Sequence, residues 1–429
     1  MKNRLFLAVF TFILVSCSQQ KGNNWPQYLG PDRNATITDA GIMREWPETG
    51  PDKAWEFPLG PGFGGAAVYN NEVFVLDRIK GESDVLRCID LETGAEKWNY
   101  SYEAEGELPY PGSRAVPVVD DNYVWCVGPH GHFHCIDKKT QQAVWSHNLL
   151  ADYGGELDNW GFSASPIVTG DLVIVAPQGE KAGVVAYNKL SGEVVWESRR
   201  LTGYRFHVSP ILGNYGGVEQ VIMTSSCVKG DGFSTDEVVS FEVKTGKELW
   251  SYKGFDSFAC IAPPVAVVNT HLLLTSCAYK DVYEPVTILL EVNKEGESYN
   301  LNELFRTEEA GCKMHPPVVI GEHIYLNNNH RVNEMSCLNW QGESCWPEKS
   351  APGFELGAII MIDGMIINQN GKNGDLHLIE PTPESYKEVG KASFFTMKGS
   401  QAWSPMAYAN GKLLARDNEK LVCVELKES

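Results

Sequence analysis

A short hairpin sequence recurs along this chain and most constrains what it can fold into. Its clearest copy is the stretch 238–250, VVSFEVKTGKELW. Val239 and Phe241 alternate with polar residues, which is the two-residue period of a half-buried strand. Gly246 lies in the polar turn that follows, where glycine can take a positive φ, and Trp250 begins the next strand. The stretch predicts two antiparallel strands that end on one large aromatic side chain.

The hairpin belongs to a longer unit that returns about every 40 to 55 residues. Each unit opens with a short strand, often after Ser-Pro or Pro-Pro, and passes through an Asn-, Asp- or Gly-rich turn into a second strand before the hairpin. Eight units can be followed, and the later ones are degenerate. Phe305 replaces the Trp in the fifth, and Phe394 or Phe395 replaces it in the seventh. Units of this length with four short strands are typical of propeller blades.

The two ends of the chain complement each other. The eighth unit stops after 421–425 without a final Trp strand, whereas residues 53–57 form an orphan strand that carries Trp55. Pairing the orphan strand with the eighth unit would close a ring and remove exposed sheet edges. We therefore predict an all-β, eight-bladed β-propeller of four-stranded antiparallel blades, closed by the N-terminal strand around Trp55. An open solenoid or a seven-bladed ring is the alternative.

The N-terminus predicts export. Lys2 and Arg4 precede an apolar run over 5–15, which is too short to span a bilayer and suits a cleaved signal. The run ends in Leu-Val-Ser-Cys, which resembles the lipobox of bacterial lipoproteins and implies lipidation of Cys17. An ordinary signal peptide with an incidental Cys is the alternative. The expected segments are a lipoprotein signal peptide 1–16, a polar tether 17–24, an irregular strap 25–52 and a single propeller 53–429.

The net charge of −19 describes a strongly acidic protein. An acidic surface argues against nucleic acid as a partner and against docking on anionic lipid through a basic patch. We therefore expect membrane contact only through the lipid anchor.

The remaining cysteines have two interpretations. Disulfides could join Cys126 to Cys135 and Cys337 to Cys345, which flank candidate turns. However, four cysteines recur at one position of the repeat, where a small buried thiol would pack. They are Cys88, Cys135, Cys337 and Cys423.

The hairpin pattern Leu-x-Cys/Phe-x-Asp/Glu-x-x-Thr-Gly-x-x-x-Trp resembles the tryptophan-docking repeat of the pyrroloquinoline-quinone-like propellers. The resemblance covers about residues 60–429, and the segment 25–34 also resembles exported bacterial members. It implies that each Trp packs on the neighbouring blade near its turn Gly. It also implies one of two functions. Some members are quinoprotein dehydrogenases, and others are non-catalytic scaffolds such as the propeller lipoprotein of outer-membrane β-barrel assembly.

The dehydrogenase branch would imply pyrroloquinoline quinone with Ca²⁺. Its members generally carry an adjacent Cys-Cys pair, which this chain lacks, and no motif places a Glu, Asn and Asp trio for calcium. We therefore favour a non-catalytic protein and assign no cofactor. His132 and His134 could share a metal, but a solvated turn without metal is the preferred interpretation. The recurring hairpin carboxylates are expected to cap turns. They are Asp90, Asp137, Glu242 and Glu291.

Residues just before each innermost strand should ring one mouth of the central channel. They include basic, acidic and aromatic side chains, which suit a sugar because aromatic rings stack on its apolar faces and charged groups fix hydroxyls or carboxylates. A His or Glu there could also act as a general acid or base. A polar mouth filled only with water is the alternative. The candidates are Arg114, Trp160, Phe162, Arg205, His207, Lys313, His315, Glu355 and Trp403, with Asp158, Asn159 and Cys260 beside them.

These observations predict a monomeric lipoprotein of the bacterial envelope, anchored to the outer membrane and facing the periplasm. It would be a platform that binds a protein partner or a glycan at the channel mouth. The alternative is an enzyme acting on alcohol or carbohydrate substrates, such as a quinoprotein dehydrogenase.

Overall fold

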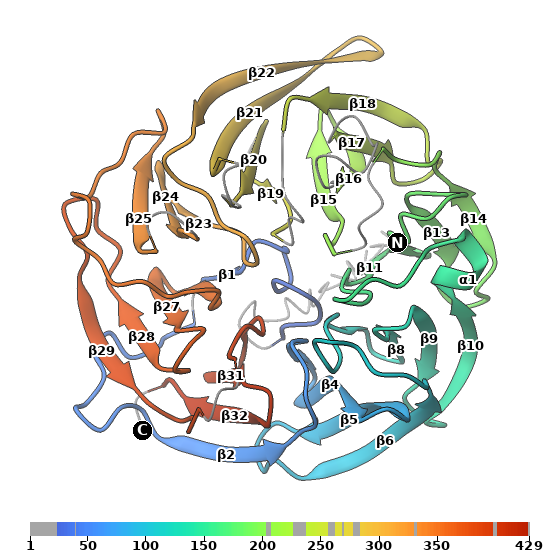
Figure 1. The fold of residues 1–429 in the computed structure, drawn as a ribbon, viewed down its shortest axis with the longest axis horizontal. Coiled ribbons are helices and arrows are strands. Elements are labelled where there is room, and N and C mark those ends of the chain that lie inside the picture. The colour runs from blue at the N-terminus through green and yellow to red at the C-terminus, as the bar shows by residue number, and fades with distance from the viewer. Residues whose placement is uncertain are drawn as a thin grey trace, which may run out of the picture.

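The computed structural model describes residues 24–38, 40–202, 207–225, 237–255, 262–267, 270–277, 284–329, 333–397 and 401–427. Eight sheets stand around a central axis, which confirms the predicted all-β, eight-bladed ring (Figure 1). The described residues include one short helix, α1 (Leu149–Tyr153), and their helices include none long and apolar enough to span a membrane.

Each blade is antiparallel, and its strands follow one another outward from the axis. The exception is a parallel strand, β1 (Thr36–Ile37), which the N-terminal segment adds to the inner edge of blade 7. Blade 1 is β3 (Ala67–Tyr69), β4 (Glu72–Ile79), β5 (Ser83–Asp90) and β6 (Glu96–Glu103). Blade 2 is β7 (Val118–Val119), β8 (Tyr123–Val127), β9 (His132–Asp137) and β10 (Gln142–Asn148). Blade 3 is β11 (Ile167–Thr169), β12 (Leu172–Val175), β13 (Val185–Asn188) and β14 (Val194–Glu197). Blade 4 is β15 (Ile211–Tyr215), β16 (Val218–Ser225), β17 (Glu237–Glu242) and β18 (Glu248–Lys253).

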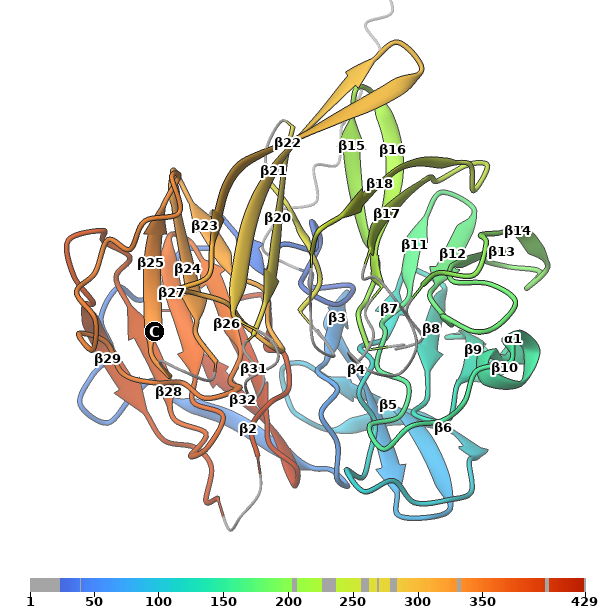
Figure 2. The ribbon, with the colours of Figure 1, turned by 45° about the horizontal axis from the view of Figure 1, so that its top comes forward.

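The second half of the ring follows the same order. Blade 5 is β19 (Val265–Ala266), β20 (His271–Ser276), β21 (Val286–Glu295) and β22 (Ser298–Thr307), and its outer hairpin projects beyond the ring (Figure 2). Blade 6 is β23 (Val318–Ile320), β24 (His323–Asn327) and β25 (Met335–Asn339). Blade 7 is β26 (Ile359–Ile362), β27 (Met365–Gln369), β28 (Leu376–Ile379) and β29 (Glu388–Ala392). Blade 8 is β30 (Ala407–Ala409), β31 (Lys412–Arg416), β32 (Lys420–Glu425) and β2 (Lys53–Pro58).

Tryptophan docking joins neighbouring blades, as the family resemblance implies. Trp196 of blade 3 packs on Gly246 in the turn of blade 4, and its Nε1 donates to the carbonyl of Val243 at 2.8 Å. A Cβ on Gly246 would lie 2.6 Å from that indole, so only glycine fits beneath it. Equivalent contacts join Trp55 to Gly94, Trp145 to Gly192 and Phe305 to Gly342.

The seam of the ring is closed by β2. This strand pairs antiparallel with β32, with Trp55 opposite Cys423 and Phe57 opposite Leu421. Trp55 then docks on blade 1, where its Nε1 donates to the carbonyl of Leu91 at 2.8 Å. The predicted closure is confirmed, and the open solenoid and the seven-bladed ring are excluded.

Blade 6 departs from the predicted four strands. Its described residues form a three-stranded sheet, continued only by a bridge between Leu338 and Ser344. Pro347 lies three residues after Ser344 and has no N–H to donate to a ladder, which disfavours extension of a fourth strand there. Trp346 nevertheless docks, because it is buried and its Nε1 donates to the carbonyl of Thr382 at 2.9 Å. In blade 7 the buried aromatic is Phe395 rather than Phe394.

Residues 24–37 run across the channel, whereas residues 40–52 run along the outside of blades 7 and 8, where Trp46 packs on Gly390 of β29 (Figure 1). Trp25 bridges Val68 at the innermost strand of blade 1, and β1 (Thr36–Ile37) adds a parallel strand to β26 of blade 7. Between them, Arg33 is buried and donates to the carbonyls of Pro166 and Pro210 at 3.2 and 2.9 Å. The strap therefore fills one end of the channel and contacts the inner edges of several blades.

The described cysteines are free thiols. Cys135 lies opposite Trp125 while Cys126 lies opposite His134, so the two thiols point to opposite sheet faces and cannot pair. His134 is not in a solvated turn, because its side chain is buried with its ring centroid 4.1 Å from that of Tyr102. The described residues hold no group of three or more ligating side chains suited to a metal.

Candidate ligand site at the centre of the ring

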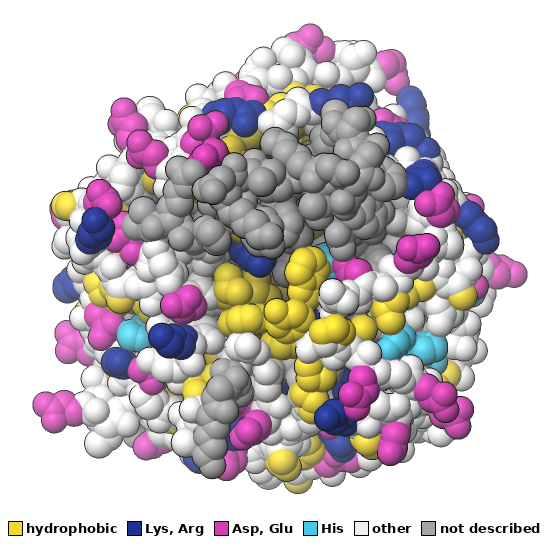
Figure 3. Space-filling view, in the orientation of Figure 1, with side chains coloured by type: hydrophobic (Ala, Val, Ile, Leu, Met, Phe, Trp, Pro, Cys, Tyr) yellow, Lys and Arg dark blue, Asp and Glu magenta, His cyan; other side chains and the backbone are white. Residues whose placement is uncertain are grey.

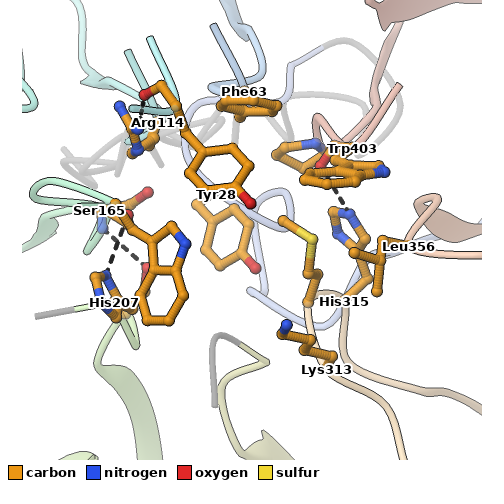
Figure 4. A pocket seen from close by; sticks show the side chains of 15 residues that line it. Tyr28, Phe63, Arg114, Ser165, His207, Lys313, His315, Leu356 and Trp403 are labelled. Carbon is orange, nitrogen blue, oxygen red and sulfur yellow. Dashed lines mark hydrogen bonds between the residues drawn. The ribbon is translucent and has the colours of Figure 1, made fainter. Parts of the chain in front are cut away.

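A cavity of about 280 Å³ lies at the axis, beside which hydrophobic side chains gather on one face (Figure 3). Its lining combines aromatic rings with hydroxyl, imidazole and cationic groups from separate blades (Figure 4). The lining residues are Tyr28, Phe63, Tyr110, Arg114, Trp160, Ser163, Ser165, His207, Ser209, Lys313, Met314, His315, Leu356, Trp403 and Pro405.

Propeller geometry explains why these residues meet. Six of them stand four positions before the first residue of the innermost strand of their blade, and equivalent positions in a ring converge on the axis. These are Phe63, Arg114, Ser163, His207, Met314 and Trp403.

The structure brings together most of the residues predicted from the sequence. Arg114, Trp160, His207, Lys313, His315 and Trp403 line the cavity. Phe162 does not, because its side chain is fully buried in the core between blades 2 and 3, and the next residue, Ser163, holds the equivalent position. Glu355 also does not line the cavity. Its backbone has φ 53°, and its neighbour Leu356 lines the wall instead. Arg205, Cys260 and Cys17 lie outside the described residues.

Sequence reasoning missed three aromatic residues of the cavity. Phe63 could have been found, because it precedes the first innermost strand by the same four positions as Trp403 precedes the last. Tyr110 lies in a loop between blades, and Tyr28 lies in the strap, which has no strand period. Tyr28 thus comes from a segment whose place in the channel no repeat could indicate.

Phe63 and Trp403 form one aromatic wall. Their rings stack with centroids 5.6 Å apart and an interplanar angle of 25°. His315 supports this wall because its Nε2 lies 3.0 Å from the carbonyl oxygen of Trp403. Burial lowers the pKa of His315 to about 4, so the neutral ring donates from Nε2 to that carbonyl at neutral pH. Trp403 is therefore held by a residue two blades away.

Asp158 and His207 form an oriented pair on another side of the cavity. The Nε2 of His207 lies 2.9 Å from Oδ2 of Asp158. The backbone N–H groups of Trp160 and Gly161 donate to Oδ1 of Asp158 at 2.8 and 3.1 Å, which fixes the carboxylate. The hydroxyl oxygen of Ser163 lies 3.5 Å from Nδ1 of His207. Such a carboxylate–imidazole pair can bind a hydroxyl or move a proton.

The lining is cationic. The guanidinium of Arg114 donates to the carbonyls of Tyr110 and Gly112 and lies 5.7 Å from the Phe63 ring centroid. Burial lowers the pKa of Arg114 to about 10, so it remains charged at neutral pH. Lys313 supplies a second cation, and the described lining contains no Asp or Glu side chain.

This donor set does not fit a calcium-bound quinone. Calcium takes six to eight oxygen ligands, usually with several carboxylates. The described lining offers hydroxyls but no carboxylate, and two cationic side chains would repel the ion.

The fold and the cavity define a propeller of the pyrroloquinoline-quinone-like repeat class. A family model described as outer membrane protein assembly factor BamB matches residues 47–149 and 81–348. These matches cover more than half of the chain, and the chain therefore belongs to that family.

Both branches of the class appear among similar proteins. Quinoprotein ethanol dehydrogenase of Pseudomonas aeruginosa is 26% identical over 159 residues, which span 36% of this chain and 24% of that protein. BamB from Moraxella catarrhalis has a similar structure, with a TM-score of 0.59, 13% identity and coverage of 88% of this chain and 98% of that chain. A europium-containing methanol dehydrogenase also has a similar structure, with a TM-score of 0.62 and 12% identity. The match covers 95% of this chain and 90% of that chain. At these identities the structural likeness shows the fold alone.

Proposed function

We propose that this protein is an exported, lipid-anchored binding protein of the bacterial envelope that takes a glycan into its central cavity. The proposal rests on the convergence of the Phe63–Trp403 stack, Trp160 and His207, which Asp158 orients from outside the lining, on one cavity. Aromatic rings stack on the apolar faces of sugars, and fixed polar groups bind their hydroxyls. Export is supported by the apolar run before Cys17 and by membership of an outer-membrane assembly-factor family.

The strap orients this cavity relative to the anchor. Trp25 pairs with Val68, and Asn24 accepts from the backbone N–H of Asn70 in the turn at the far end of β3 from Phe63. A tether over 17–24 reaches at most about 28 Å. Lipidation of Cys17 would therefore hold the strap end toward the membrane and leave the cavity open to the periplasm.

A glycan-binding screen tests the proposal. Wild type is compared with Trp403→Ala and His207→Ala, and Trp340→Ala is the matched control because Trp340 packs on His271 outside the cavity. Both cavity variants should lose binding, and the control should keep it. Thermal unfolding shows that each variant is folded. Equal glycan binding by all four proteins would refute the site.

A protein partner is the second candidate, and one surface favours it. The outer edges of blades 2 and 3 expose Val144, Leu190, Val194 and Val195 by 46–49%. Docking would cover these apolar side chains. Affinity capture from envelope membranes should recover a partner with wild type and less with a Val144→Asp, Val195→Asp double variant. Equal recovery would exclude this surface.

The Asp158–His207 pair and the quinoprotein likeness keep an oxidoreductase as the enzymatic alternative. Purified protein with added pyrroloquinoline quinone and Ca²⁺ should reduce a dye with alcohols or sugars if it is one. Absence of a quinone absorbance band and of turnover would remove this alternative.

A further inference from the structure

We infer that the cavity selects acidic glycans, in which carboxylate or sulfate groups contact Arg114 or Lys313. This inference rests on the proposed glycan-binding function and specifies its ligand class. The starting observation is a contrast in charge. The protein carries a net charge of −19, whereas the described cavity lining contains two cationic side chains and no carboxylate.

Arg114 is built as an anion site. Its hydrogen-bond acceptors, the carbonyls of Tyr110 and Gly112, are neutral and fix the plane of the guanidinium. A guanidinium has five N–H donors, so donors remain for a ligand. In the described residues no carboxylate forms an ion pair with it; Asp158 and Asp84 favour its charged form only through space, and the cost of burial outweighs them. A charge taken out of water without a counter-charge is costly, and an anionic ligand would supply that counter-charge.

Lys313 approaches the cavity from another blade. In Figure 4, Arg114 and Lys313 lie on opposite sides of the cavity, with Tyr28 between them. An acidic sugar could therefore stack its ring on an aromatic wall and place its charged group against either cation. Arginine binds a carboxylate or sulfate through two parallel N–H bonds, which gives geometric selectivity as well as affinity.

The same arrangement predicts discrimination against neutral sugars. A neutral analogue would keep the stacking and hydroxyl contacts but lose the charge-assisted hydrogen bonds. Such bonds contribute enough to change affinity about tenfold or more. The salt dependence should differ as well, because raising ionic strength screens partly exposed charges but leaves stacking unaffected.

Calorimetric titration of the whole protein tests this inference. The probes are trigalacturonic acid, its neutral methyl ester and a sulfated galactose trisaccharide. The variants are Arg114→Gln and Lys313→Gln, with Lys80→Gln as the control, because Lys80 is an exposed cation, 71% accessible, that does not line the cavity. Unfolding curves confirm that each variant is folded, and the lysine variant keeps the test valid if Arg114→Gln does not fold.

The inference predicts that an acidic probe binds about tenfold or more tightly than the ester. Arg114→Gln and Lys313→Gln should each reduce this preference and the salt dependence, while Lys80→Gln should keep both. Tighter binding of only the carboxylate or only the sulfate would identify the acidic group. Equal binding of acid and ester, or equal weakening of both by the cavity variants, would overturn the inference and leave glycan binding standing. Failure of every probe to bind would overturn the acidic-glycan inference, and glycan binding itself would fall only if the glycan screen were negative as well.

Discussion

Gly246 shows how one residue fixes the contact between two blades. Its φ is 69°, and a Cβ would lie 2.6 Å from the Trp196 ring. Gly246→Ala should lower the free energy of unfolding by about 2–4 kcal/mol, from left-handed backbone strain plus overpacking. Gly296→Ala is the matched control, because Gly296 has φ 63° with no atom within 4 Å of an added Cβ. It should cost only the backbone part, about 1–2 kcal/mol. Urea unfolding measures both, and equal losses would contradict the docking contact.

His134 should make stability depend on pH. Burial lowers its pKa from an ordinary 6.5 to about 4, so between these values the unfolded chain binds a proton that the folded chain does not. Stability should therefore fall as pH decreases from 6.5 toward 4, by roughly 3 kcal/mol from this residue. His134→Phe should make this fall shallower in urea titrations at several pH values. Identical pH dependence in wild type and variant would refute the assignment.

At this scale, most of the cavity could be predicted from the repeat. Residues such as Arg114, His207 and Trp403 stand at one register before the innermost strands. The prediction of Phe162 was wrong by one residue, because the loop before β11 has no period that fixes the register. The side chain of the next residue, Ser163, lines the cavity, and Phe162 is buried. Tyr28 had no such signal, since its position depends on long-range packing of the strap.

The strap is the element that shapes the cavity floor. Arg33 bonds the carbonyls of Pro166 and Pro210, and its guanidinium lies 5.9 Å from the ring of Tyr28. Arg33→Met should leave these buried carbonyls unpaired and lower stability by about 3 kcal/mol or more. Arg44→Met, on the exposed part of the same strap, should cost below about 1 kcal/mol. Amide hydrogen exchange should show faster exchange at 24–37 for Arg33→Met only, and equal exchange in both variants would contradict this role.

Strands could be predicted where an alternating apolar pattern was followed by a turn motif. The alternation in β17 and the Thr-Gly turn gave the hairpin, whereas blade 6 kept its docking Trp346 and lost the fourth strand at Pro347. The sequence pattern predicts aromatic docking better than strand pairing. Docking needs one aromatic side chain, whereas pairing needs several consecutive residues with free N–H groups.

Ring closure is a property of the whole molecule. Trp55 joins β32 of blade 8 to the turn of blade 1 across the seam. Trp55→Ala should therefore lower stability by about 3–5 kcal/mol. Trp98→Ala should cost less, because Trp98 is only half-buried and Gln141 replaces glycine in the facing turn of blade 2. If urea unfolding gave equal losses of stability for Trp55→Ala and Trp98→Ala, the seam contact would contribute no more stability than the contact of Trp98.

The global fold could be predicted because eight imperfect repeats specify one ring, while a ligand could not, because the side chains at the repeated cavity positions differ from blade to blade. The central claim is that this ring holds an acidic glycan at its axis. A crystal structure with trigalacturonic acid tests it most directly. We expect density for a sugar ring stacked on an aromatic wall that includes Trp403, with a carboxylate against Arg114 or Lys313. Sugar bound elsewhere, or an empty cavity at saturating ligand, would contradict it.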